Sequence, residues 1–93
     1  MKNNTLLEAI ESRVQAKKRL LKTEERARIQ RNQYFVESIG MDMESQAYHD
    51  LDDLEDECHE IIQLCKERLS ELDAELFTLE SFRLEVKSLG GIK

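Results

Sequence analysis

The sequence predicts an all-α protein: a two-helix antiparallel hairpin with coiled-coil-like packing, which dimerises into a four-helix bundle. Three observations lead to this fold class. The 93 residues include no proline and three glycines, and 37% of them are charged, a composition that favours long helices. An apolar stripe with heptad spacing runs through the second half of the chain. One glycine, Gly40, marks a single break. We therefore expect one helical-hairpin domain over residues 1–93.

The first helix is expected over about residues 6–39. Thr5 and Glu8 match a capping box, in which each side chain bonds the backbone N–H of the other residue. The expected apolar stripe consists of Leu7, Ile10, Val14, Leu21, Ile29, Val36 and Ile39. Lys18, Glu25 and Asn32 interrupt the heptad pattern, so this helix contributes less to the core than the second.

The break between the helices is expected at about residues 40–42. Gly40 is suited to the left-handed conformation that ends a helix, and Asp42 is suited to cap the next one. The alternative is one unbroken helix through Gly40, at a cost of about 1 kcal/mol relative to alanine. Glycine alone does not decide between the two arrangements.

The distribution of charge favours the hairpin. Residues 13–31 hold eight basic residues and two acidic ones, whereas residues 42–60 hold nine acids and no Lys or Arg. A turn at Gly40 would place residue i beside about residue 81−i, so that 21–31 would face 50–60 with opposite charge. A parallel, in-register dimer of straight helices would instead set like charges side by side.

The second helix is expected over about residues 43–89, ending at Gly90-Gly91 with Lys87 in its last turn. Every seventh residue from Leu51 to Val86 is apolar. The heptad position three residues later begins apolar but is polar at Arg68 and Glu75. There the next residue in the sequence, Leu69 or Leu76, is apolar instead. The expected seam is Leu51, Leu54, Cys58, Ile61, Cys65, Leu69, Leu72, Leu76 and Leu79.

The expected second helix is longer than the first and should extend about ten residues beyond it. This overhang would lie out of reach of the first helix. We expect the following apolar residues to form a surface for a second copy or a protein partner: Phe77, Phe82, Leu84, Val86 and Leu89.

The two cysteines lie seven residues apart, about 10 Å along a helix, which is too far for a disulfide within one chain. The simpler interpretation makes them small apolar fillers of the seam. A redox switch or an intermolecular disulfide is the alternative. We expect the second helices of two chains to face each other at these cysteines. An antiparallel arrangement, which the charges favour, would bring Cys58 close to Cys65 of the partner subunit, whereas a parallel one would set each cysteine opposite its own copy.

Several functional classes are disfavoured. Asp56 and His59 have a metal-site spacing, but their heptad positions place them on the outer face, so we expect no metal and no cofactor. We find no catalytic motif, so we expect a protein that is not an enzyme. No apolar run approaches the roughly 18 residues of a membrane span, and the first residues do not resemble a signal peptide, so we expect a cytoplasmic protein.

We therefore expect a non-enzymatic protein–protein interaction protein: a small helical adaptor, chaperone or regulatory subunit that binds itself and an unidentified protein through an apolar helical face. The alternative is an acidic inhibitor of the phage or plasmid type, whose negative stripe imitates phosphates and blocks a basic site. That stripe consists of Asp52, Asp53, Asp56 and Glu60; its plainer interpretation is a solvated face.

A third hypothesis is nucleic-acid or anionic-membrane binding by the basic run 17–26 of the first helix. The plainer interpretation is that the acidic second helix neutralises this run. The net charge of −6 also argues against nucleic acid.

Overall fold

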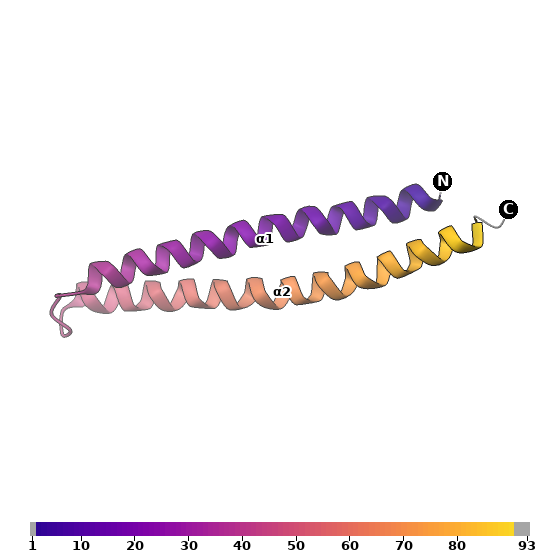
Figure 1. Cartoon of the computed structure of the whole chain (residues 1–93). Coiled ribbons are helices and arrows are strands. Elements are labelled where there is room, and N and C mark those ends of the chain that lie inside the picture. Colours follow the sequence, from indigo (N-terminus) through magenta and orange to yellow (C-terminus); the bar gives the residue numbers. More distant parts are fainter. Residues whose placement is uncertain (1, 91–93) are drawn as a thin grey trace. The chain divides into compact units, whose positions relative to one another are not determined.

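A computed structural model of the chain describes residues 2–90 and confirms an all-helical hairpin. Helix α1 spans Lys2–Ser38 and helix α2 spans Gln46–Gly90, and the two helices pack against each other (Figure 1). Neither described helix has an apolar stretch long enough to cross a membrane. The chain divides into unit 1, residues 1–20 and 68–93, and unit 2, residues 21–67.

Helix α1 begins earlier than expected. It starts at Lys2, so Thr5 lies inside the helix and the predicted capping box does not mark its start. Lys and Asn carry no strong penalty in a helix, and nothing in the first residues forces the chain to break before Thr5. At its other end the helix closes at Ser38, whose hydroxyl donates to the Phe35 carbonyl at 2.6 Å.

The connection between the helices covers residues 39–45 rather than 40–42. Gly40 has φ +83°, which confirms the predicted left-handed conformation. The cap of α2 is Ser45 and not Asp42, because the Ser45 Oγ accepts the Tyr48 N–H at 3.2 Å. Asp42 shapes the turn before it: its Oδ1 accepts the Glu44 N–H at 3.0 Å. Gly91 lies outside the described residues.

The buried stripe of α2 alternates steps of four and three residues. Ile62 is 3% exposed, whereas Ile61, expected in the seam, is 42% exposed. Leu54 is likewise exposed, while Glu55 beside it is half-buried. The predicted seam is therefore wrong at Leu54 and Ile61. Of the remaining members, Cys58, Cys65 and Leu72 are buried, and the half-buried ones are Leu51, Leu69, Leu76 and Leu79.

The predicted apolar stripe of α1 is wrong from Leu21 onward, whereas of its earlier members Ile10 is buried and Leu7 and Val14 are half-buried. Ile10, Glu24 and Ala27 are the buried residues of this helix among those with described side chains. They are joined by half-buried residues that keep the same spacing, among them Arg13, Lys17, Leu20 and Tyr34. The predicted members that are exposed instead are Leu21, Ile29, Val36 and Ile39.

Polar contacts show which residues of the two helices meet. In unit 1, Arg13 pairs with Glu75 at 3.2 Å and Lys17 with Asp73 at 2.7 Å. In unit 2, an Arg31 Nη1 lies 3.1 Å from the His59 Nδ1. In each pair the two residue numbers add up to 88 or 90. The predicted pairing of residue i with about residue 81−i is therefore wrong.

Two causes raise this total. The connection is longer than predicted, which moves the start of α2 to a higher residue number. Side chains on a helix also lean toward its N-terminus, so across an antiparallel pair each side chain meets a residue with a higher number than the one level with its backbone. The predicted charge matching fails accordingly: among the described residues, no ion pair joins the cations of 21–31 to the acids of 50–60.

Replacing Leu72 should destabilise the hairpin, because this side chain is only 1% exposed. We expect Leu72→Ala to lower the free energy of unfolding by about 2–3 kcal/mol, the lower part of the range for buried leucines. Urea unfolding followed by circular dichroism measures the change. Leu84→Ala, at a site that is 68% exposed, is the control and should change stability by less than about 0.5 kcal/mol. Equal effects would contradict the assigned seam.

The pairing of Lys17 with Asp73 can be tested by charge reversal. Lys17→Glu should destabilise the protein and Asp73→Lys should restore it, with a coupling energy of about 0.5 kcal/mol because the pair is exposed. A double-mutant cycle in urea gives this coupling. The neighbouring Lys18 is exposed, so a cycle of Lys18→Glu with Asp73→Lys should show weaker coupling. Equal coupling in the two cycles would contradict the assigned pairing.

Candidate functional site

The residues considered for metal binding do not come together. In the part of the chain that the structure describes, no three His, Cys, Asp or Glu side chains gather where they could hold a metal ion. Asp56 and His59 are exposed, and the His59 Nδ1 lies against Arg31. The features that stand out are instead a polar network, an acidic face and two apolar surfaces.

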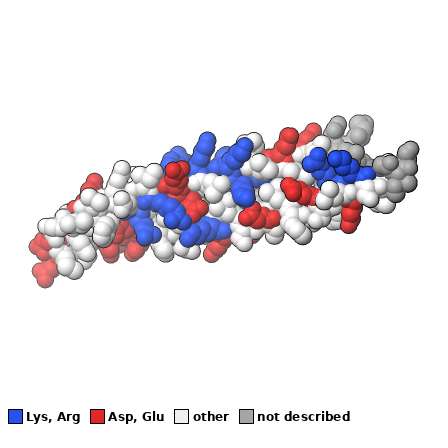
Figure 2. Space-filling view, viewed as in Figure 1, with Lys and Arg blue, Asp and Glu red and all other residues white. Residues whose placement is uncertain are grey.

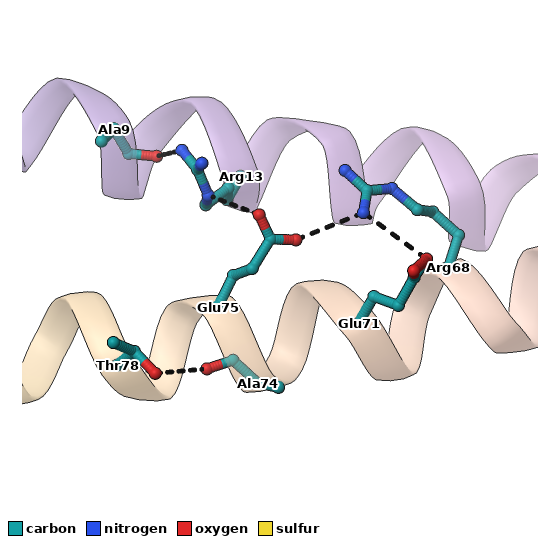
Figure 3. Close-up of polar contacts among 7 residues, drawn as sticks. All are labelled: Ala9, Arg13, Arg68, Glu71, Ala74, Glu75 and Thr78. Carbon is teal, nitrogen blue, oxygen red and sulfur yellow. Dashed lines mark hydrogen bonds and ion pairs between the residues drawn. The ribbon is translucent and has the colours of Figure 1, made fainter.

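The polar network ties the two helices of unit 1 together. Glu75 lies between two guanidinium groups: its Oε1 is 3.2 Å from the Arg13 Nε, and its Oε2 is 3.2 Å from an Arg68 Nη1 (Figure 3). Arg68 also lies 3.6 Å from Glu71, and Arg13 donates to the Ala9 carbonyl. Glu75 interrupts the apolar pattern of α2 because it bridges to α1, and Arg68 interrupts it because it holds the Glu75 carboxylate from the same helix.

Each pair in this network is about one-third to two-thirds exposed, so each is worth only a few tenths of a kcal/mol to about 1 kcal/mol. Their main effect is geometric. They favour one alignment of the helices in unit 1, because a shifted alignment would separate the opposite charges. Arg13 and Lys17 are themselves half-buried, as is typical of long cationic side chains whose charged ends reach the edge of a seam.

The predicted partner surface lies on α2 in unit 1 and is exposed. Phe82, Val86 and Leu89 have helical spacing and share one face, while Phe77 and Leu84 share another. All five are between 41% and 75% exposed. The expectation that this segment lies beyond the reach of the first helix is wrong, since Leu6 and Leu7 line a hollow together with Arg83 and Lys87. Leu6 and Leu7 reach this far because the two helices pair with residue numbers that add up to 88 or 90 rather than the predicted 81.

Unit 2 contains a buried carboxylate that the sequence pattern did not indicate. The side chain of Glu24 is 12% exposed and accepts hydrogen bonds from the Arg28 Nη2 at 2.7 Å and Nε at 3.3 Å. The two residues lie one helical turn apart, so the guanidinium can offset much of the cost of burying the charge. The four-residue spacing of Glu24 and Arg28 indicates such a pair. The predicted apolar stripe, however, ran through Leu21 and Ile29 and did not include Glu24.

The cysteines are buried in unit 2 and are free thiols. Cys58 is 8% exposed and Cys65 is 4% exposed within the single chain. The expectation that they face a second copy is therefore wrong, because they already pack inside the hairpin. Burial at seam positions agrees with their interpretation as small apolar fillers.

The acidic face runs along the outside of α2 in unit 2. Its members, Asp52, Asp53, Asp56 and Glu60, are all exposed. None of them takes part in an ion pair among the residues that the structure describes. In the same unit, Arg28 pairs with Glu24 of its own helix and not with a carboxylate of the acidic face. The acidic face thus retains most of its charge.

A second apolar surface lies where α1 meets the connection. It consists of Phe35, Val36, Ile39 and Met43, and we call it the apolar tip. Each of these side chains is more than half exposed. The sequence pattern assigned Val36 and Ile39 to the core and did not single out Phe35 or Met43. Phe35 also lines a hollow with Arg28, Arg31, Asn32 and Glu55. The Glu55 Oε1 is buried without a hydrogen-bond partner among the described residues.

The chain matches no known protein family, no curated protein and no solved structure. Its function must therefore be argued from its own surfaces. These are the apolar surface of α2 in unit 1, the acidic face and the apolar tip.

Because both thiols are buried, we expect them to form disulfides and to react with thiol reagents only slowly. Neither Cys58→Ser nor Cys65→Ser, alone or mixed, should form a disulfide dimer under mild oxidation, and the wild-type thiols should react slowly with a disulfide reagent until urea unfolds the chain. A cysteine placed at the exposed Ser70 in a protein lacking both native cysteines is the control and should react fast. Rapid crosslinking of the single variants would show that the thiols lie at an interface between chains.

Proposed function

We propose that this chain is a non-enzymatic protein-interaction module, a small helical adaptor, chaperone or regulatory subunit. It acts through the exposed apolar surface of α2 in unit 1. The observation that carries the proposal is the stripe formed by Phe82, Val86 and Leu89 on one face of a regular helix. Burying one such side chain contributes roughly 1.5–3 kcal/mol, so three adjacent ones suffice to anchor a partner.

The small core of the hairpin supports the same proposal. Among the described residues only six apolar side chains are buried, while fourteen large apolar side chains are exposed. A chain of this size is expected to cover more of its apolar surface than two helices allow. A second copy is the simplest cover, and we propose a homodimer arranged as a four-helix bundle with coiled-coil packing. The free thiols suit a reducing compartment, so we place the protein in the cytoplasm.

One observation favours a second candidate, an acidic inhibitor that occupies a basic site on another protein. The exposed face of Asp52, Asp53, Asp56 and Glu60 is not neutralised by ion pairs among the described residues. A row of carboxylates on a straight helix can take the place of phosphates in a basic groove. The two candidates differ in how their binding responds to salt.

Replacing Phe82 by aspartate tests the first candidate. Phe82→Asp should leave the helix content unchanged, because the side chain is exposed, but should lower the sedimentation mass or abolish capture of a partner from the native cell. Ser70→Asp adds the same charge at an exposed polar position of α2 and is the matched control.

The salt dependence of partner capture separates the candidates. Binding through the apolar surface should change little as salt is raised, whereas binding through the acidic face should weaken steeply. If Phe82→Asp keeps both the mass and the partner of the wild type, the first candidate is wrong.

A further inference from the structure

The apolar tip is an ordered surface that α2 leaves uncovered. Phe35 and Val36 lie in the last turn of α1, which ends at Ser38, and Ile39 follows directly. Ile39 continues the turn, since its N–H donates to the Val36 carbonyl at 3.2 Å. Met43 follows in the connection, where side-chain and backbone hydrogen bonds of Asp42 and Ser45 hold the backbone.

The exposure of these apolar side chains favours a role for the tip as a binding surface. Ile39 is 66% exposed and Met43 is 67% exposed, and two more large apolar side chains lie beside them. Single exposed apolar residues are common on protein surfaces, but four large ones within nine residues are a concentration of the kind found at binding sites. Methionine suits such a patch because its flexible side chain adapts to different partners.

The charge around the tip indicates the chemistry of the ligand that would bind there. Residues 32–65 include ten acids and no Lys or Arg. Asp42 and Glu44 stand on either side of Met43, and both are exposed. In the view of Figure 2, the end of unit 2 that carries the connection shows red and white atoms, and the blue atoms begin farther along the helices. Arg28 and Arg31 line the hollow beside Phe35, but the exposed charges beside Ile39 and Met43 are acidic. This part of the tip complements a ligand with apolar and cationic sides.

We infer that the apolar tip docks a cationic amphipathic helix of another protein. The apolar side of that helix covers Phe35, Ile39 and Met43, and its Lys and Arg side chains pair with Asp42 and Glu44. This is helix recognition by an apolar patch, with charge complementarity selecting the partner. The inference rests on the proposed function in so far as both make the chain an interaction module, but it concerns a different surface.

Charge disfavours a second copy docked tip to tip, nucleic acids and anionic membranes as ligands of the apolar tip. A second copy docked tip to tip would bring two acidic rims together with no Lys or Arg of residues 32–65 to separate them. Nucleic acids and anionic membranes are repelled for the same reason. A neutral apolar helix would cover the patch but would leave the carboxylates without partners.

A synthetic peptide provides the probe. It is a fluorescein-labelled peptide of leucine and lysine, long enough for about five helical turns and spaced to give a helix one apolar and one cationic face. Two control peptides separate the contributions: one has glutamate in place of every lysine, and the other has the same composition in an order that forms no apolar face. Fluorescence anisotropy with the full chain measures binding at low and at raised salt.

Variants of the full chain locate the binding site. Ile39→Ser should weaken binding of the leucine–lysine peptide about tenfold, as expected for the loss of an apolar anchor. Leu64→Ser is the matched control, since Leu64 is 57% exposed on α2 and belongs to neither apolar surface, while Ile39 is 66% exposed. It should change the affinity less than about twofold.

The contribution of the Asp42 and Glu44 carboxylates to peptide binding is tested with a second set of variants. Asp42→Asn together with Glu44→Gln should weaken binding several-fold at low salt and much less at high salt. The asparagine side chain keeps an oxygen that can accept the hydrogen bond from the backbone N–H of residue 44, so the turn is preserved. Glu80→Gln with Glu85→Gln removes the same charge from exposed positions of unit 1 and should have little effect.

Several results would overturn the inference. These are equal losses in the tip variants and their controls, binding of the glutamate peptide as tightly as the lysine peptide, and self-association that Ile39→Ser abolishes. Circular dichroism of each variant confirms that the helices are intact. Because Phe82→Asp tests a separate surface, failure at the tip leaves the proposed function standing, and failure at Phe82 leaves the tip standing.

Discussion

The packing of one regular stripe of α2 against α1 is the constraint on which the rest of the structure depends. In unit 2 the stripe includes Cys58, Ile62 and Cys65, and in unit 1 it includes Leu72 and its half-buried neighbours. Few apolar residues of helix α1 lie at the positions that face this stripe. It supplies a buried Ala27, a carboxylate at Glu24 and the stems of long cationic side chains instead.

This mixed seam explains both the alignment of the helices and what they leave outside. The charged ends of Arg13 and Lys17 have to find partners at the edge of the seam in unit 1, and Glu75 and Asp73 provide them. Because polar residues take up seam positions, large apolar residues such as Ile29 and Val36 are placed on the solvent side of α1. The exposed apolar surfaces and the small core are thus two results of one arrangement.

The two apolar surfaces differ in the charge that surrounds them. The stripe at Phe82 lies on a stretch of α2 that carries both signs of charge, including Arg83 and Lys87. The apolar tip is acidic around Ile39 and Met43, where Asp42 and Glu44 are exposed, whereas Arg28 and Arg31 lie beside Phe35. An apolar surface of mixed charge tolerates a second copy of the same chain, whereas an acidic one favours a cationic partner. We therefore propose that the two surfaces bind partners with different selectivity.

The sequence by itself determined that the chain is helical, that it breaks near Gly40, and that the seventh-residue series through Cys58, Cys65 and Leu72 faces inward. Composition and periodicity suffice for these features, because they follow from local conformation and from the helical repeat. It could not decide between Ile61 and Ile62, nor between Leu20 and Leu21. Neighbouring residues differ by only about 100° around a helix, so either choice gives an apolar stripe in a single chain segment. Tertiary packing made the choice, because only the paired helix shows which side chains are buried and which charges have partners.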